Sequence, residues 1–516
     1  MCPGCDIALA ILEEGAQPGR QPLSALADDA ARTPLISGYE PEPEDEQPLY
    51  AARKKVYPQR VSGTYRRIKW AILLVTLGIY YLLPFVRWDR GPNAPGQAVL
   101  IDFPSRRFYF FFIEIWPQEF YYITGLLILA AMALFLMNAV AGRLWCGYLC
   151  PQTVWTDLFQ AIERWTEGDR REHLQRDRHP WTAERIARSA AKHFLWLMVA
   201  WWTGGAWVLY FADAPTLVHD LATFQAPVIA YAFIGILTFT TYTLAGWMRE
   251  QVCVYMCPWP RIQAALTDEY ALNVTYRYDR GEPRASLKKA AVLHTEGLPA
   301  GDCIDCLQCV HVCPTGVDIR GGPDLGCIQC GLCIDACDAV MKKIGRPARL
   351  IAYDTDINIK RREQSLQPLY RIIRTRTVLY AAIIGIVGMV MSYAFATRMI
   401  DAISVLHDRN PLFVHLSDGS LRNAYTLRIL NKSLEKKTFA ITISGLTDAD
   451  IDVIGGSGFA NGNPLVDVGP DQSREVRVLV TEREQLPAKT SVPIRFSILP
   501  KNGGPAASAA DHFFGP

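Results

Sequence analysis

Five long apolar stretches constrain this chain more than any other feature. They cover residues 70–86, 120–140, 193–211, 227–247 and 378–396. A helix needs about 20 mostly apolar residues to cross a bilayer, and inside lipid it must satisfy its own backbone hydrogen bonds. A buried core helix would explain any single stretch, but five of this length favour a membrane. The sequence therefore predicts a multi-domain membrane protein with an α-helical bundle of five transmembrane helices.

The distribution of Lys and Arg predicts the orientation of these helices. Basic residues are dense in residues 53–69, ahead of the first stretch, and in the loop 142–192. The connection 212–226 contains no Lys or Arg. Because basic loops stay in the cytoplasm, we expect the N-terminus and residues 248–376 to be cytoplasmic and the C-terminal region to lie outside. The net charge of +2 gives no reason to expect nucleic acid as a partner.

Two cysteine runs of identical spacing predict metal clusters. Both read Cys-x2-Cys-x2-Cys-x3-Cys, starting at Cys303 and Cys327. This is the bacterial ferredoxin run, whose fourth cysteine binds the other cluster. The sequence thus predicts a cytoplasmic two-cluster, bacterial ferredoxin-like α+β domain. One [4Fe–4S] cluster would be held by Cys303, Cys306, Cys309 and Cys337, and the other by Cys327, Cys330, Cys333 and Cys313.

The alternatives to an electron-transfer role are zinc ribbons, which also use Cys-x2-Cys pairs, and purely structural clusters. Pro314 follows the fourth cysteine of the first run, as is usual for this motif, whereas Asp338 stands there in the second. That departure leaves the ligands intact and concerns only the local turn.

Two further cysteine pairs directly follow apolar stretches. Cys146 and Cys150, and then Cys253 and Cys257, form Cys-x3-Cys-Pro motifs with a constant offset of 107 residues, which indicates an internal repeat. Pro151 and Pro258 each follow the second cysteine of a pair and suit the first position of a helix. Cys150 and Cys257 would then lie at helix N-termini, where the helix dipole favours a thiolate. Thiolates bind soft metals such as Cu(I). We interpret the four residues as a copper or redox site, although buried cysteines can also act as small hydrophobes.

The C-terminal region changes in character. Residues 424–430, 439–444, 476–481 and 493–499 are short alternating stretches separated by turn residues, which is typical of an all-β sandwich. Its His407 and His415 could bind copper, but solvated or packed histidines are the commoner case. His193 is the one histidine in a predicted span, at its very end, so a haem held by two histidines is not supported.

These observations divide the chain into five parts. We expect a disordered cytoplasmic segment at 1–50, a membrane domain at 51–260, the ferredoxin domain at 261–376, the fifth span at 377–397 and the sandwich at 398–516. No cleavable signal peptide is expected, because the first 60 residues are polar and acidic. Cys2 and Cys5 form a lone pair that we interpret as idle, with a metal or redox role as the alternative.

Several motifs resemble the FixG/RdxA/CcoG family of cytochrome c oxidase accessory proteins. They are "WCGYLCPQTVWTDLFQAIERWTEGDR", "REQVCVYMCPWPRIQ", "YDRGEPR", the double ferredoxin run, "GRPARLIAYDT" and "LHDRNPLFVHLSDGSLRNAYTLRILNK". The resemblance covers roughly residues 50–516. It implies a multi-pass protein of the bacterial inner (cytoplasmic) membrane with a periplasmic, Ig-like C-terminal domain.

The resemblance also implies a cupric reductase. Such a protein reduces Cu(II) to Cu(I) for a cbb-type oxidase, and its partners would be copper ion and oxidase assembly factors or a copper chaperone. Two other functions stay open from the sequence: a polyferredoxin linked to quinol or a partner reductase, and a non-catalytic assembly scaffold or redox sensor. The electron donor and the formation of a homo-oligomer are open as well.

Overall fold

The computed structural model describes residues 55–515 except 92–93, 434, 448 and 484–490. The N-terminal segment with Cys2 and Cys5 lies outside the described residues. Within the described ranges, four helical segments are long and apolar enough to cross a membrane: Thr64–Phe85, Pro117–Ala141, Val228–Met248 and Thr375–Ala396. They contain helices α3 (Thr64–Leu82), α4 (Tyr121–Ala141), α10 (Val228–Thr241) and α17 (Thr375–Ala396).

The third predicted span falls in α8 (Ala183–Val208), which is not among these four. The first half of α8 is charged, and Trp, Thr and Gly interrupt the apolar second half. The number of five spans is therefore not confirmed. Large apolar side chains such as Phe194, Trp201 and Trp202 are nevertheless exposed along α8, so its crossing of the bilayer stays a prediction.

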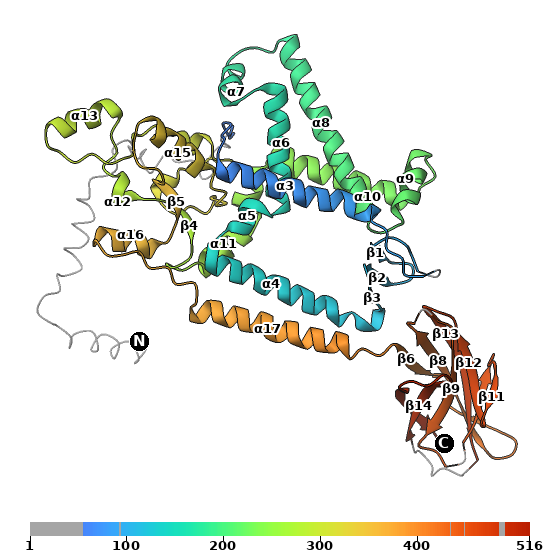
Figure 1. Cartoon of the computed structure of the whole chain (residues 1–516). Coiled ribbons are helices and arrows are strands. Elements are labelled where there is room, and N and C mark those ends of the chain that lie inside the picture. Colours follow the sequence, from blue (N-terminus) through green and yellow to red (C-terminus); the bar gives the residue numbers. More distant parts are fainter. Residues whose placement is uncertain (1–54, 92–93, 434, 448, 484–490, 516) are drawn as a thin grey trace, which may run out of the picture. The chain divides into compact units, whose positions relative to one another are not determined.

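Small residues let the membrane helices pack closely (Figure 1). α4 lies beside α17, where Gly125 contacts Met391, and α8 lies beside α10, where Gly204 faces the carbonyl oxygen of Ile234. Glycine at such positions allows two helix backbones to approach each other within a membrane. A three-stranded antiparallel sheet, β1 (Val99–Asp102), β2 (Arg107–Phe110) and β3 (Ile113–Ile115), connects α3 to α4.

Short helices follow α4 and α10 and position the cysteine pairs. After α4 come α5 (Leu144–Tyr148), α6 (Pro151–Glu167) and α7 (Arg170–Asp177). α10 continues as the π-helical turn η4 (Tyr242–Met248), followed by a second such turn, η5 (Val252–Met256), and by α11 (Trp259–Leu266). The helix predicted to begin at Pro151 is confirmed, with Cys150 as its N-cap. The helix predicted to begin at Pro258 begins one residue later, at Trp259, with Pro258 as its N-cap. The short helix α9 (Ala214–Ala222) connects α8 to α10.

The ferredoxin runs lie in a small α+β module. Strands β4 (Asn273–Tyr276) and β5 (Ile351–Asp354) pair antiparallel, with Val274 opposite Tyr353. Between them lie α12 (Tyr278–Gly281), α13 (Leu287–Thr295), α14 (Gln308–His311), η6 (Ile319–Gly321) and α15 (Leu332–Lys343), and α16 (Asp356–Glu363) follows. Val274, Tyr276, Ile334 and Ile351 form its core together with several of the cysteines.

The C-terminal region is an all-β sandwich, as predicted. One sheet contains β10 (Ala449–Ile454), β13 (Gln472–Glu482), β8 (Leu421–Asn431), β6 (Asp401–His407) and β7 (Val414–His415). The other contains β11 (Gly458–Ala460), β12 (Asn463–Val468), β9 (Lys437–Ser444), β14 (Ser491–Pro500) and β15 (Ala507–Phe514). Inward-facing Tyr425, Leu427 and Ile429 alternate along β8, as a strand that buries one face requires.

Candidate iron-sulfur and thiol site

The eight ferredoxin cysteines form two groups, each around a small cavity. Cys303, Cys306, Cys309 and Cys337 line the first cavity. Cys313, Cys327, Cys330 and Cys333 line the second, to which Cys309 also contributes. The fourth cysteine of each run has thus crossed to the other group, which is the pairing that the spacing rule predicts. Ligation of iron by these eight residues stays a prediction.

Matching backbone turns curve both runs around their cavities. Asp305 and Leu307 of the first run have φ values of 55° and 57°, and Gln329 and Gly331 of the second have 56° and 73°. Such left-handed residues reverse the chain direction and cluster at functional sites. Leu307 and Gly331 are also the N-caps of α14 and α15. Equal spacer lengths therefore fold into equal local geometry.

Burial keeps these thiols protonated in the absence of metal. It is the largest cause that raises the pKa of Cys309, Cys327 and Cys337 to about 12. A metal that binds such thiols must displace their protons. The groups are therefore suited to a tightly bound soft metal centre and not to exposed thiol chemistry.

The second run lacks its proline because its helix does not end there. Cys337 and Asp338 lie inside α15, which continues to Lys343. In the first run, α14 ends at His311, so Pro314 falls beyond the helix. Proline inside a helix removes one backbone hydrogen bond and clashes with the preceding turn. The Asp338 carboxylate instead accepts a hydrogen bond of 2.7 Å from the Arg349 amide.

The four membrane-edge cysteines come together, although the two pairs are 107 residues apart. Burial is the main cause that raises the pKa of Cys146 to about 12, and the nearby Cys150, Cys253 and Cys257 thiols add to it. Burial likewise raises the pKa of Cys253 to about 12, with contributions from Cys150 and Cys257. The Cys146 Sγ also donates a hydrogen bond of 3.3 Å to Gln263 Oε1. All twelve described cysteines are free thiols.

This thiol group lies directly against the second ferredoxin group. Cys146 and Cys253 pack with Cys330 and Cys333 in one apolar cluster. The backbone at Gly147 is so close that an added Cβ would lie 2.8 Å from the Ile328 carbonyl oxygen. The two sulfur-rich sites are therefore neighbours across the boundary between the membrane helices and the ferredoxin module.

Polar residues that sequence reasoning missed hold this boundary together. Arg143 is 7 % exposed and donates to the backbone oxygens of Leu325 (2.6 Å) and Pro260 (2.9 Å). The Tyr148 hydroxyl donates to the Cys330 carbonyl oxygen at 2.9 Å. Asp335 accepts hydrogen bonds from two backbone amides at the start of α3. One signal was visible in the sequence, since an arginine precedes each cysteine pair, Arg143 in one and Arg249 in the other.

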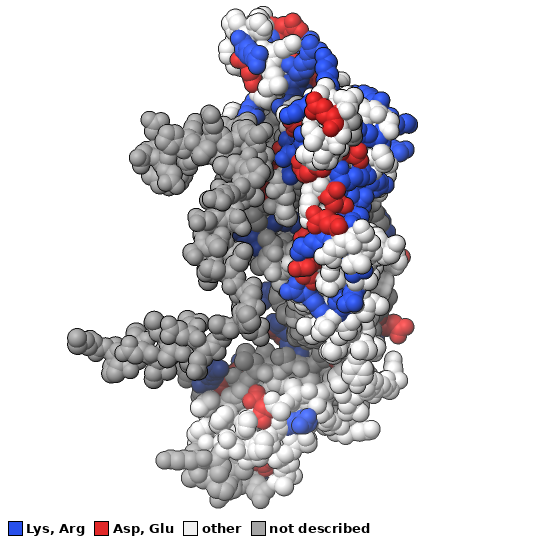
Figure 2. All heavy atoms as spheres, turned by 90° about the vertical axis from the view of Figure 1, so that its left-hand side faces the viewer, with Lys and Arg blue, Asp and Glu red and all other residues white. Residues whose placement is uncertain are grey.

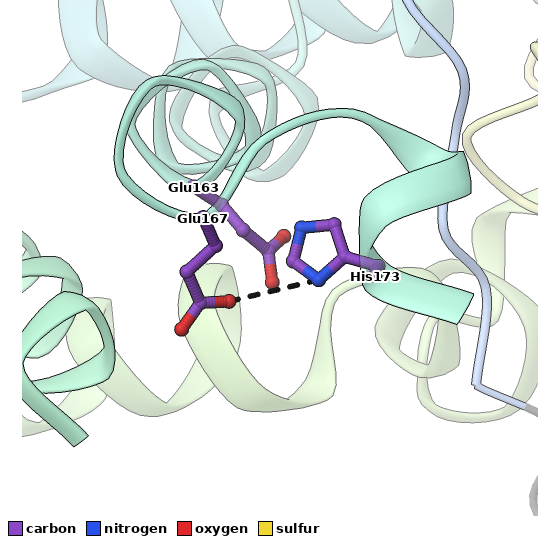
Figure 3. A group of neighbouring side chains, drawn as sticks. All are labelled: Glu163, Glu167 and His173. Atoms are coloured by element: carbon purple, nitrogen blue, oxygen red, sulfur yellow. Dashed lines mark ion pairs between the residues drawn. The ribbon is translucent and has the colours of Figure 1, made fainter. Parts of the chain in front are cut away.

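A buried group of acids and a histidine lies nearby (Figure 3). Glu163 and Glu167 from α6 point toward His173 from α7, and their ligand atoms all lie within 4.8 Å of one another. Arg249 pairs with Glu163 at 2.7 Å, and Lys192 pairs with Glu167 at 3.0 Å. Burial lowers the pKa of His173, which favours its neutral form. Two carboxylates are thus matched by two cations, and the group forms a structural network. The network ties α6 to Arg249, which precedes Cys253 by four positions.

The two sandwich histidines do not form a common site. His407 packs against Tyr425 and Phe514, and burial lowers its pKa. His415 lies on the exposed strand β7 against Phe413. Packing therefore explains His407, and an exposed position explains His415.

Comparisons with known proteins agree with this arrangement. A family model described as a 4Fe-4S dicluster domain matches residues 248–356, and one described as a 4Fe-4S binding domain matches residues 123–167. A third, the IG-like fold at the C-terminal of FixG, matches residues 391–516.

Two curated relatives extend over most of the chain. The nitrogen fixation protein FixG of Rhizobium meliloti (strain 1021) is 49 % identical over 461 residues, which cover 84 % of this chain and 87 % of the relative. Protein RdxA of Cereibacter sphaeroides is 51 % identical over 402 residues, which cover 77 % of this chain and 84 % of that relative.

Proposed function

Because the chain belongs to the FixG/RdxA family, we propose that this membrane iron–sulfur electron-transfer protein is a cupric reductase. Its substrate is Cu(II), its product is Cu(I), and the product serves the assembly of a cbb-type cytochrome c oxidase. The observation that carries the proposal is the packing of Cys146 and Cys253 against Cys330 and Cys333. It supports a path for electrons from the ferredoxin module to the membrane edge.

The two groups of four cysteines fit the clusters that the family models imply. When bound, [4Fe–4S] clusters supply single electrons, and reduction of Cu(II) to Cu(I) takes one electron. The protein would shield part of each cluster from water, because Cys309 and Cys330 are each only 7 % exposed, whereas Cys306 of the first group is exposed. Soft sulfur ligands at the membrane edge favour Cu(I) over Cu(II).

The charge distribution supports a cytoplasmic location for the ferredoxin module and the thiol group. Figure 2 looks onto the side where α13 and α15 lie in Figure 1, and Lys and Arg side chains, interspersed with Asp and Glu, gather over the upper part of its described surface. Basic segments stay on the cytoplasmic side of a bacterial inner membrane. In this orientation the sandwich is periplasmic, α8 crosses the bilayer as the fifth span, and Cu(I) leaves through a copper chaperone or an oxidase assembly factor.

The experiment follows Cu(I) with a Cu(I)-selective chelator. Full-length protein in detergent is reduced with dithionite, freed of excess reductant and mixed with Cu(II). We expect the rate of Cu(I) formation to fall at least tenfold when Cys146, Cys150, Cys253 and Cys257 are all replaced by Ser. A Cys2→Ser/Cys5→Ser variant is the matched thiol control and should equal the wild type. An unchanged rate in the four-residue variant would contradict the proposal.

A second candidate function is electron exchange with a quinone. A groove of about 840 Å³ between α8 and α10 is lined by aromatic residues, among them Trp201, Phe239 and Trp247. Close to it, the Tyr242 hydroxyl and His193 Nδ1 are hydrogen-bonded at 2.9 Å, so a polar pair stands beside an apolar groove. If reduced protein ignores Cu(II) yet is oxidised by a short-chain ubiquinone, this function replaces the first.

A further inference from the structure

A cavity of about 1170 Å³ lies where the chain before α3, the helix α6 and the first ferredoxin run meet. Its lining comes mainly from residues 58–63, from the first three turns of α3 and from the second half of α6, with Val312 and Pro314 on the ferredoxin side. None of the described cysteines lines it. The cavity is therefore a separate site, which neither the electron path nor the copper chemistry uses.

The lining of this cavity carries more positive than negative charge. Its charged residues are Arg60, Arg66, Arg67 and Arg164, against Asp157, Asp169 and Glu172. Asp157 pairs with Arg66 at 2.8 Å and also with the buried Lys69 at 4.0 Å. The Asp169 carboxylate is the N-cap of α7 and accepts a hydrogen bond of 3.0 Å from the backbone amide of Arg60. Two of the three carboxylates are thus already engaged.

Arg164 is half-buried in this lining and has no ion pair of its own among the described residues. Burial lowers the pKa of Arg164, and the nearby Arg66 lowers it further, although Asp157, Asp169 and Glu163 act in the opposite direction. The surroundings therefore favour its charged form less than water does. An anion bound beside a half-buried cation of this kind would stabilise it.

A buried amide in the same lining lacks an acceptor. Gln160 is 3 % exposed, and its Nε2 has no hydrogen-bond partner among the described residues. Such a group is unfavourable unless a ligand or water satisfies it. Gln160 and Arg164 are four positions apart on α6, so they lie on the same face of the helix. An amide donor beside a guanidinium matches the oxygens of a phosphate group.

The cavity continues along α3 as an apolar surface. Arg67, Trp70, Ala71 and Leu74 all line it, and their spacing of three and four residues places them on one face of the helix. Leu74 is 64 % exposed and lies in the segment Thr64–Phe85, which is long and apolar enough to cross a membrane. A soluble phosphate compound would leave this apolar face uncovered, whereas an acyl chain would cover it.

We propose that the cavity binds an anionic phospholipid, with its phosphate held by Arg164 and Gln160 and one acyl chain along the apolar face of α3. Basic pockets beside membrane helices bind such headgroups, and the guanidinium group suits phosphate. Val312 and Pro314 flank Cys313 in the sequence and line the cavity. The bound lipid therefore also contacts the ferredoxin module and helps to fix it at the membrane surface, whichever electron acceptor the protein serves.

Native mass spectrometry of the full-length protein tests the proposal. Protein freed of lipid in a neutral detergent is mixed with equal amounts of phosphatidylglycerol and phosphatidylcholine that have the same acyl chains. We expect the wild type to retain about tenfold more phosphatidylglycerol than phosphatidylcholine, and Arg164→Gln to retain about fivefold less phosphatidylglycerol than the wild type. Arg171→Gln makes the same change of charge at an exposed arginine of α7 outside the cavity and should equal the wild type. No preference in the wild type, or equal losses in the two variants, would overturn the proposal.

Thermal unfolding distinguishes a lipid from a soluble phosphate and remains informative if Arg164→Gln fails to fold. Phosphatidylglycerol should raise the unfolding temperature of the wild type above its value with phosphatidylcholine, whereas inorganic phosphate should not. Gln160→Leu removes the unpartnered amide without a change of charge. It should be as stable as the wild type without lipid and should gain less from phosphatidylglycerol. Equal stabilisation by inorganic phosphate, or an equal lipid effect in Gln160→Leu and the wild type, would contradict the proposed site.

Discussion

The Arg143 guanidinium donates a hydrogen bond of 3.2 Å to the backbone oxygen of Cys327. Arg143 follows the second membrane-spanning segment, whereas Cys327 begins the second ferredoxin run. The same side chain also binds Leu325 and Pro260. One buried arginine thus fixes the ferredoxin module on the membrane helices at the place where their sulfur groups meet.

Replacement of Arg143 by Leu should loosen this attachment. The carbonyl oxygens that Arg143 binds would be left unpaired in a buried place, at a cost of about 2–5 kcal/mol. We expect lower thermal stability and a lower reduction potential of the nearby cluster, because a positive charge beside an anionic cluster has been removed. Arg143→Lys keeps the positive charge. The reduction potential of the cluster should therefore change less in this variant than the thermal stability does. Identical potentials for wild type and Arg143→Leu would show that Arg143 has a purely mechanical role.

Gly147→Ala should separate the two sulfur groups. The new Cβ would lie 2.8 Å from the Ile328 carbonyl oxygen and 3.1 Å from the Cys330 Cα, both of which are backbone atoms. We expect a loss of about 1–3 kcal/mol in the free energy of unfolding and slower electron transfer to the acceptor. Gly78→Ala is the control, since nothing lies within 4 Å of its Cβ. The helix α3 that carries Gly78 should be unchanged or more stable in Gly78→Ala. Equal free energies of unfolding for the two variants would argue against the close contact at Gly147.

Asp338→Pro should damage the second run, although it restores the usual motif. Asp338 lies inside α15, and a proline within a helix costs about 3 kcal/mol or more. Because Cys337 precedes it directly, the first cluster should lose iron as well as stability. Asp338→Ala keeps the helix and serves as the control for the lost contact with Arg349. Full iron content in Asp338→Pro would mean that α15 can end early without harm.

The contact between β3 and the sandwich should weaken as the pH rises. Burial is the main cause that raises the pKa of Glu114 from 4.5 to about 7, and the nearby Asp471 carboxylate adds to it. Between these pH values the folded chain holds a proton that the unfolded chain has released. The associated stability is present below about pH 4.5 and is lost as the pH rises through 7. Hydrogen exchange around β3, corrected for its intrinsic rate, should be faster at pH 8 than at pH 6. Glu114→Gln should remove this difference, and a difference that persists would assign it to another group.

Local patterns in the sequence determined much of this protein. The spacing of the ferredoxin runs predicted the crossed grouping of Cys313 and Cys337, because short spacers allow few backbone paths. Alternation along residues 424–430 predicted a strand with one buried face, and Pro151 predicted the start of α6. In each case the responsible interaction joins residues that are close in the chain.

Tertiary structure decided what depends on residues far apart in the chain. No local spacing encodes that Cys146 meets Cys253, or that both pack against Cys330. The same holds for Arg143 and Lys69, which look like ordinary basic residues in the sequence and are buried in the fold. The sequence shows the four membrane-edge thiols only as two separate motifs, and the packing of α5 and η5 on the ferredoxin module brings Cys146 and Cys253 together beside Cys330. The physical reason is that such contacts depend on how whole helices pack against one another, which no local spacing encodes.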